Sequence, residues 1–163
     1  MTLVSDKSAL MELNNILSSR TVGEIDLKGV PKLMPSYTVT DAAVAMRDMK
    51  HGSTLVCDEG RLVGIFTERD WLRMVEGCAD LSAKLSEVMT EPQTVTTDDS
   101  LLDAIRLMDE GGYRRVPVVN GKGAPVGIID VKTVIHFLVQ YFPAAVYNQA
   151  SSKQLIATSP EGA

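Results

Sequence analysis

The feature that most constrains the fold is an internal repeat. Gly64 and Gly127 each follow an apolar run, and each leads through a short turn into a run with helical character. The segments upstream of the two glycines also correspond: 41–49 matches 100–108, and 55–58 matches 117–120. Self-similarity of this kind indicates two copies of one supersecondary unit and argues against two unrelated domains.

The turn after the first glycine carries the residues with the clearest chemical character. Thr67 and Asp70 lie three residues apart where a strand is expected to pass into a helix. Thr67 suits the N-cap position, and the carboxylate of Asp70 suits the positive end of the helix dipole. Both side chains also offer oxygen atoms to a hydroxylated ligand over the turn. A capping box without a ligand and a ligand site both remain open.

Length and composition limit the classes of protein to consider. The 163 residues suffice for one ordinary domain or two small intertwined ones, and with 5% aromatic residues the core must be aliphatic. The net charge of −5 and the absence of a basic run argue against binding to nucleic acid or a membrane surface. No signal pattern or long apolar run is visible, which predicts a cytoplasmic protein.

The pattern in the first half of the chain predicts a helix and then a repeat. An amphipathic helix is expected over 5–19, with Leu10, Leu13 and Leu17 on one face. Thr21 can cap a short helical turn, and prolines and a glycine predict a loop over 26–36. The first repeat is then expected as a strand at 37–40, a helix at 41–50, hairpin strands at 54–58 and 61–66, and a helix at 68–76.

The second half predicts the same order of elements. We expect a turn of helix at 85–89, a strand at 93–96, a helix at 100–110, hairpin strands at 115–119 and 125–129, and a helix at 131–141. A short helix at 144–149 and a fraying tail would follow. The predicted units are an N-terminal helix (1–20), repeat 1 (21–78), repeat 2 (84–142) and a C-terminal tail (143–163).

Ordered motifs in both repeats give the chain a family resemblance. They are Val88-Met89-Thr90-x-Pro92-x-Thr94-Val95, the helix from Ser100 to Met108, the strand at 115–120 and the two glycine turns. Over about residues 20–142 the chain resembles a pair of CBS domains, named after cystathionine beta-synthase, in the arrangement called a Bateman module. The resemblance implies an α+β fold of two βαββα repeats with pseudo-twofold symmetry. It also implies two clefts between the repeats, which in this family often hold AMP, ADP, ATP or S-adenosylmethionine.

The resemblance assigns roles to the two turns unevenly. Family members that bind adenosine ligands carry Gly-h-x-Thr/Ser-x-x-Asp, with the Asp on the ribose hydroxyls. The first repeat matches this pattern with Gly64, Thr67 and Asp70. In the second repeat Asp130 stands where Thr or Ser is expected, and Thr133 stands where the Asp is expected. The second cleft is therefore expected to be a poor ribose site.

The resemblance also implies which residues complete the Asp70 cleft. The adenine side would be formed by Ile65, Asp99, Ala104 and Tyr113. Phosphates would be met by Arg114 and Arg115 before the strand at 115–119, with Arg69 or Lys132 also within reach. The alternative for Arg114 and Arg115 is a solvated surface pair.

A regulatory, ligand-sensing module is the function that these observations favour. The alternative is a ligand-free structural or dimerisation module. An enzyme is the weakest hypothesis, because His51 and His136 are the only histidines and no catalytic set is visible by spacing. We expect no metal and no required cofactor, since the spacing of Cys57 and Cys78 fits no metal motif.

A homodimer is the expected assembly. The helices predicted at 68–76 and 131–141 carry more apolar side chains than two small sheets can cover, namely Trp71, Leu72, Val75, Ile135, Leu138 and Val139. The resemblance points the same way, since the family forms disc-like dimers. A regulated protein would be a further partner, and the sequence does not identify it.

Overall fold

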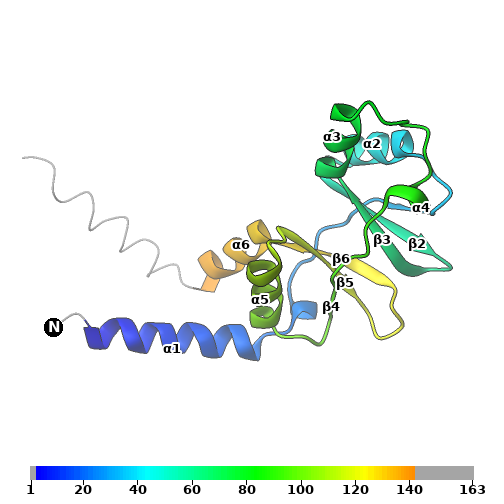
Figure 1. Ribbon diagram of the computed structural model, residues 1–163. Coiled ribbons are helices and arrows are strands. Elements are labelled where there is room, and N and C mark those ends of the chain that lie inside the picture. Colours follow the sequence, from blue (N-terminus) through cyan, green and yellow to red (C-terminus); the bar gives the residue numbers. More distant parts are fainter. Residues whose placement is uncertain (1–2, 142–163) are drawn as a thin grey trace, which may run out of the picture.

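The structure, a computed structural model, describes the backbone of residues 3–141 and the side chains from residue 10 onward. The helix predicted at 144–149 and the tail from residue 143 lie outside the described residues. Two lobes stand side by side, and one long helix projects from the second of them (Figure 1). Lobe 1 consists of residues 32–89. Lobe 2 consists of residues 3–27 and 95–141, and the crossing segments 28–31 and 90–94 join the lobes.

Lobe 1 is a three-stranded sheet covered by helices. Its elements are β1 (Lys32–Leu33), α2 (Val39–Asp48), β2 (Ser53–Asp58), β3 (Arg61–Thr67), α3 (Glu68–Glu76) and α4 (Leu85–Val88). The sheet order is β1-β2-β3, with β1 parallel to β2 and β3 antiparallel to it. Positive φ angles at Glu59 and Gly60 close the hairpin, and these are the angles that a tight two-residue turn requires.

Lobe 2 repeats the same topology. Its elements are α1 (Leu3–Ser19), the 3₁₀ turn η1 (Val22–Glu24), β4 (Val95–Thr96), α5 (Leu101–Gly111), β5 (Arg115–Val119), β6 (Pro125–Asp130) and α6 (Val131–Tyr141). The sheet order is β4-β5-β6, again with one parallel and one antiparallel pair. The predicted α+β fold of two repeats with an N-terminal helix is therefore confirmed.

The first strand of repeat 1 lies earlier than the sequence predicted. Residues 37–40 form no strand, because the Thr38 hydroxyl accepts a hydrogen bond from the amide of Asp41 and caps α2. The strand is β1 instead, inside the predicted loop 26–36, where Leu33 pairs with Val56 of β2. A capping box thus overrides the β-propensity of Tyr37-Thr-Val-Thr40.

Each lobe takes part of its core from a segment on the far side of the connection between the repeats. In lobe 2, Leu17 of α1 and Val22 of η1 are buried with residues of α5 and of the β4-β5-β6 sheet. In lobe 1, Leu85 of α4 is buried with Phe66 and Val56, although α4 comes after the connection between the repeats. The two lobes are therefore interlocked by exchanged segments.

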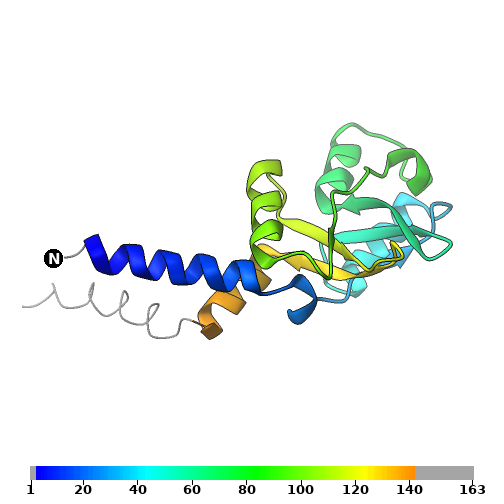
Figure 2. The ribbon, with the colours of Figure 1, turned by 90° about the horizontal axis from the view of Figure 1, so that it is seen from below.

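The two sheets meet through a small apolar cluster between the lobes. Val30, Leu55, Ile65 and Ile128 are buried together there. Each crossing segment also adds a backbone bridge to the last strand of one sheet: Thr90 pairs with Ile65 of β3, and Lys28 pairs with Ile128 of β6. Figure 2 shows the two sheets close together with α1 pointing away from them. These two bridges position the clefts described below.

The projecting helix α1 is packed at one end only. Leu17 is 7% exposed and Leu13 packs against the lobe 2 core, whereas Leu10 is 64% exposed. The helix predicted at 5–19 is confirmed. Within the described chain, only its C-terminal part contacts the rest of the molecule, mainly α5.

Candidate functional site

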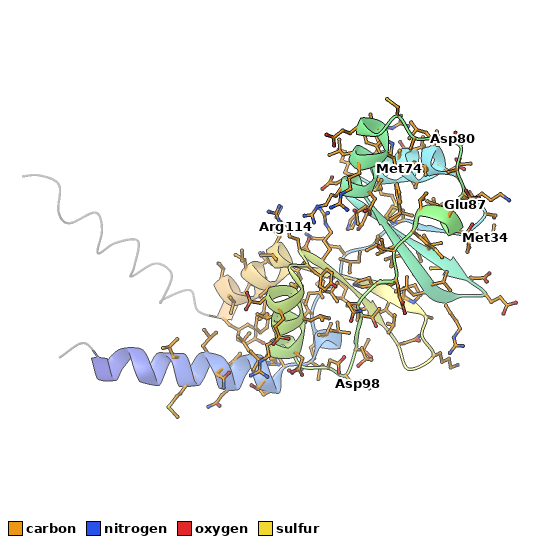
Figure 3. The ribbon with its side chains drawn as sticks, viewed as in Figure 1. Met34, Met74, Asp80, Glu87, Asp98 and Arg114 are labelled. Atoms are coloured by element: carbon orange, nitrogen blue, oxygen red, sulfur yellow. The ribbon has the colours of Figure 1, made fainter. Side chains whose placement is uncertain are left out.

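A cleft of about 390 Å³ lies between the lobes at the β3–α3 turn. Three segments line it: the turn and first helical residues of repeat 1, residues 90–93 of the crossing segment, and the residues before and at the start of β5 in repeat 2. The structure thus brings Thr67 and Asp70 together with Ile65, as predicted for the ribose and adenine sides. Figure 3 shows Arg114 at the notch between the two lobes. We call this the Asp70 cleft.

Only one of the two carboxylate oxygens of Asp70 takes part in the cap of its own helix. Its Oδ2 atom accepts hydrogen bonds from the Thr67 amide at 2.9 Å and from the Thr67 hydroxyl at 2.6 Å. Over residues 3–141, no donor is hydrogen-bonded to Oδ1. The two interpretations of Thr67 and Asp70 are therefore compatible, since the capping box leaves one charged acceptor for a ligand hydroxyl.

Gly64 explains how the crossing segment comes so close to β3. A Cβ atom at Gly64 would overlap the side chain of Met89. Next to it, the amide of Ile65 donates to the Thr90 carbonyl at 2.9 Å, and the Thr90 amide donates back at 3.0 Å. The close approach that a glycine in a strand suggests is thus made by a neighbouring chain segment, which forms one side of the cleft.

Positive charge predominates around the Asp70 cleft. Four arginines line it, Arg69, Arg73, Arg114 and Arg115, against three carboxylates, Glu68, Asp70 and Glu91. Arginine carries a planar set of donors that suits phosphate oxygens. The chemistry of the lining therefore fits an anionic ligand that also carries hydroxyl groups.

Part of this lining was missed by the sequence analysis. Arg73 lies one helical turn after Arg69, and that spacing could have placed both on one face of α3. Residues 90–93 of the crossing segment belong to the motif that carries the family resemblance. No local pattern indicates that they border the cleft. Its position depends on the bridge between Thr90 and Ile65, which is a tertiary contact.

Not every predicted site residue reaches the cleft. Tyr113 lines it, together with the predicted arginines 69, 114 and 115. Ala104 is fully buried in the lobe 2 core, because it lies on the face of α5 that packs on the sheet. The Asp99 carboxylate accepts from the Thr96 amide at 2.6 Å and closes the turn before α5. Lys132 borders a separate hollow beside α6.

The corresponding position in repeat 2 is satisfied from within the chain. Oδ1 of Asp130 accepts from the Thr133 amide and hydroxyl, both at 2.7 Å, and Oδ2 accepts from Lys28 Nζ at 2.9 Å. Burial raises the pKa of Asp130, but hydrogen bonds from Lys28 and Thr133 outweigh burial and hold the pKa below its usual value. Lys28 occupies the bridge position that Thr90 has in the first cleft. Both oxygens of Asp130 are therefore engaged.

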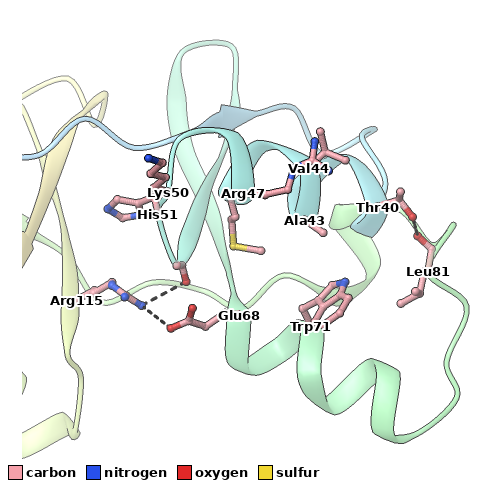
Figure 4. A pocket seen from close by; sticks show the side chains of 12 residues that line it. Thr40, Ala43, Val44, Arg47, Lys50, His51, Glu68, Trp71, Leu81 and Arg115 are labelled. Carbon is pink, nitrogen blue, oxygen red and sulfur yellow. Dashed lines mark hydrogen bonds and ion pairs between the residues drawn. The ribbon is translucent and has the colours of Figure 1, made fainter.

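A second hollow, of about 670 Å³, lies on the outer side of lobe 1 between α2 and α3. Apolar side chains line it, Ala43, Val44, Trp71 and Leu81, together with the basic residues Arg47, Lys50, His51 and Arg115 (Figure 4). Glu68 and Arg115 border both this hollow and the Asp70 cleft. We call it the α2–α3 groove.

His51 at the edge of this groove is held by a neighbouring serine. Its Nδ1 atom lies 3.1 Å from the Ser53 hydroxyl and 3.2 Å from the Ser53 carbonyl oxygen. Burial lowers the pKa of His51; the hydrogen bond to Ser53 opposes this, Arg115 and Lys28 lower the pKa further, and Asp130 raises it. The net direction is downward, so the neutral imidazole is favoured in the folded protein.

No group of three or more His, Cys, Asp or Glu side chains in residues 3–141 is placed to hold a metal ion. Over the same residues, no helix combines the length and the apolar character that a membrane span requires.

Comparisons with known proteins agree with the fold. The family model described as "CBS domain" matches residues 22–77 and again residues 85–140. The mitochondrial CBS domain-containing protein CBSX3 of Arabidopsis thaliana is 36% identical over 110 residues, which cover 63% of this chain. The match covers 53% of that protein, so this chain spans about half the length of its plant relative.

Two solved structures of similar fold are complexes with AMP. CBSX2 in complex with AMP has a TM-score of 0.66 at 27% identity, covering 76% of this chain and 98% of that one. A CBS domain protein from Pyrobaculum aerophilum complexed with AMP has a TM-score of 0.68 at 23% identity, covering 81% and 98%. At that lower identity the likeness concerns the fold alone.

Proposed function

This chain belongs to the CBS domain family, as a pair of CBS domains, and on that basis we propose that it is a regulatory module that binds an adenosine nucleotide in the Asp70 cleft. The observation that carries the proposal is one juxtaposition: an ionised carboxylate with an unengaged oxygen lies in the same cleft as four arginines. A ribose phosphate presents the complementary groups, vicinal hydroxyls and an anion.

The contacts expected of such a ligand follow from the lining. Oδ1 of Asp70 would accept from a ribose hydroxyl, a charge-assisted bond that contributes about 1.5–3 kcal/mol. Ile65 and Tyr113 offer flat or apolar surface for the adenine ring, and Arg114 and Arg115 offer donors to the phosphates. The AMP complex of CBSX2, which has a similar fold, supports an adenosine nucleotide as the ligand.

The charge around the cleft favours a phosphorylated ligand over S-adenosylmethionine. The sulfonium of S-adenosylmethionine is a cation, and four arginines line the cleft against three carboxylates. Like charges at this range repel one another, whereas a phosphate is attracted. Regulation would follow because a ligand shifts a module by as much as it binds one arrangement better than another.

Titration calorimetry tests the proposal directly. AMP, ADP, ATP, adenosine and S-adenosylmethionine are titrated separately into the full chain. We expect one phosphorylated nucleotide per chain, because only Asp70 among the two corresponding positions has an oxygen to spare. No binding by any of the five would overturn the proposal, and two equal sites per chain would show that the second cleft was misjudged.

A ligand-free structural module is the second candidate, and the capping box favours it. The capping box of Thr67 and Asp70 is complete without any ligand, as is that of Ser100 and Asp103 at the start of α5. In that case Asp70 would matter for stability alone. The same titration separates the two functions.

A further inference from the structure

Arg115 lies on the boundary between the Asp70 cleft and the α2–α3 groove. Its Nη1 atom donates to the Gly52 carbonyl at 3.3 Å and to Oε1 of Glu68 at 3.4 Å. Figure 4 shows the side chain of Arg115 reaching from repeat 2 across to Glu68 in repeat 1. The guanidinium of Arg115 is therefore held by Gly52 and Glu68, at the place where the cleft and the groove share their lining.

The position of the guanidinium depends on a glycine. A Cβ atom at Gly52 would lie 2.8 Å from both terminal nitrogens of Arg115 and 2.8 Å from the carboxyl carbon of Glu68. The Gly52 carbonyl also accepts from the amide of Glu68 at 3.1 Å. A side chain at residue 52 would therefore displace the ion pair, so the local backbone provides room for it.

The ion pair is weak enough to be exchanged. The side chains of Arg115 and Glu68 are 33% and 63% exposed, and pairs this accessible to water contribute little to stability. Glu68 is also the first residue of α3, where the helix dipole stabilises a carboxylate that has lost its partner. Separating the pair would therefore leave neither Arg115 nor Glu68 as a buried, unpaired charge.

We propose that Glu68 determines ligand specificity by competing with the ligand phosphate for Arg115. This inference rests on the proposed function and concerns the same cleft. With a nucleoside, Arg115 stays paired with Glu68; with a nucleotide, the phosphate takes the guanidinium. The carboxylate thus reduces the affinity for phosphorylated ligands and leaves the affinity for the unphosphorylated nucleoside unaffected.

The exchange also connects the cleft to the outer side of lobe 1. Arg115 and Glu68 border the α2–α3 groove as well as the cleft. When a phosphate takes Arg115, the groove loses a positive charge while Glu68 keeps its negative one. Trp71, the single tryptophan of the chain, lines the same groove, so its fluorescence reports the change.

The test compares Glu68→Gln with Glu91→Gln in calorimetric titrations of the full chain with AMP and with adenosine. We expect Glu68→Gln to bind AMP about two- to fivefold more tightly, the range of an exposed ion pair, with adenosine affinity unchanged. Glu91 is a second carboxylate of the cleft. Its substitution measures the general effect of removing one negative charge and should give a smaller gain.

The double variant Arg115→Ala/Glu68→Gln distinguishes competition from simple repulsion. Without the guanidinium, the gain from Glu68→Gln should largely vanish. An equal gain in Glu68→Gln and Glu91→Gln, or a full gain in the Arg115→Ala background, would overturn the inference. If Glu68→Gln left AMP binding unchanged, the inference would be wrong and the proposed function would stand. If the parent protein bound no AMP, both the inference and the proposed function would be wrong.

Discussion

At the scale of single residues, the two clefts differ in what each carboxylate already holds. Asp70 uses one oxygen for its cap, whereas Asp130 gives one oxygen to Thr133 and the other to Lys28. A ligand hydroxyl can therefore be added at Asp70 without breaking a bond. At Asp130 it would have to displace an ammonium group at 2.9 Å.

Replacing Asp70 by alanine should weaken AMP binding by about 2–3 kcal/mol, or roughly 30- to 150-fold, because a charge-assisted bond to the ribose is lost. Calorimetry measures the loss. Asp103→Ala is the matched control, since Asp103 has the same place in the capping box of α5 and lies outside the cleft. Both variants should lose similar stability, and Thr133→Ala should cost little AMP affinity. An Asp70→Ala protein that binds like the parent would refute the site.

His51 should make stability depend on pH. Its pKa is lowered on folding, chiefly by burial, so the unfolded chain binds the proton more readily than the folded one. Stability is then complete above the usual histidine pKa and falls as the pH is lowered through it. We expect the melting temperature to be lower at about pH 5.5 than at about pH 7.5.

Two variants test whether His51 is the source of this pH dependence of stability. His51→Gln should flatten the difference between the two pH values, while His136→Gln, on the exposed side of α6, should keep it. If the parent melted at the same temperature at both pH values, the account of His51 would be wrong.

The sequence predicted the side chains of the site best where the pattern is local. Thr67 and Asp70 belong to one turn, and their capping role follows from spacing alone. Ala104 and Asp99 were assigned to the cleft by resemblance, yet the first faces a core and the second closes a turn. Packing between the lobes determines which face of α5 lies toward the cleft. No local sequence pattern indicates that orientation.

At the scale of elements, helices were predicted better than strands. α2, α3 and α5 begin with capping boxes and carry apolar residues at helical spacing, so their positions agree with the prediction within a few residues. β1 and β4 have two residues each, which is too short for an alternating pattern. β1 was missed for that reason, since only its pairing with β2 defines it.

The end of α1 that packs on lobe 2 should carry the stability of that helix. Leu17→Ala should lower the free energy of unfolding by about 2–5 kcal/mol, because it empties a buried position. Leu10→Ala, in the same helix but 64% exposed, should change it by less than about 0.5 kcal/mol. Chemical denaturation measures both.

Removing residues 1–19 should likewise lower the melting temperature, since Leu17 leaves with them. A truncated protein that melts and associates like the parent would contradict a role for α1. A concentration-dependent loss in Leu10→Ala would instead place the exposed half of the helix against a second copy of the chain.

At the scale of the whole molecule, two helices leave apolar surface uncovered. Over the described chain α3 has no buried residue, and Leu72 is 59% and Ile135 54% exposed. Burying such a surface is favourable, and we expect a homodimer through α3 and α6. Leu72→Glu or Ile135→Glu should shift the protein toward monomer in sedimentation at micromolar concentration. Met34→Glu, equally exposed but on another face, should not. A parent protein that sediments only as monomer would exclude the dimer.

The exchanged segments also determine when the molecule can fold during its own synthesis. Leu85 completes the core of lobe 1, and Lys28 meets Asp130 across 102 residues of chain. A nascent chain that ends at the connection 77–84 therefore lacks part of the lobe 1 core, and its N-terminal segment has no lobe 2 to pack on. Contacts so distant along the chain slow folding. We therefore expect lobe 1 to complete its core only after Leu85 has been synthesised, and the N-terminal segment to pack only once lobe 2 is present.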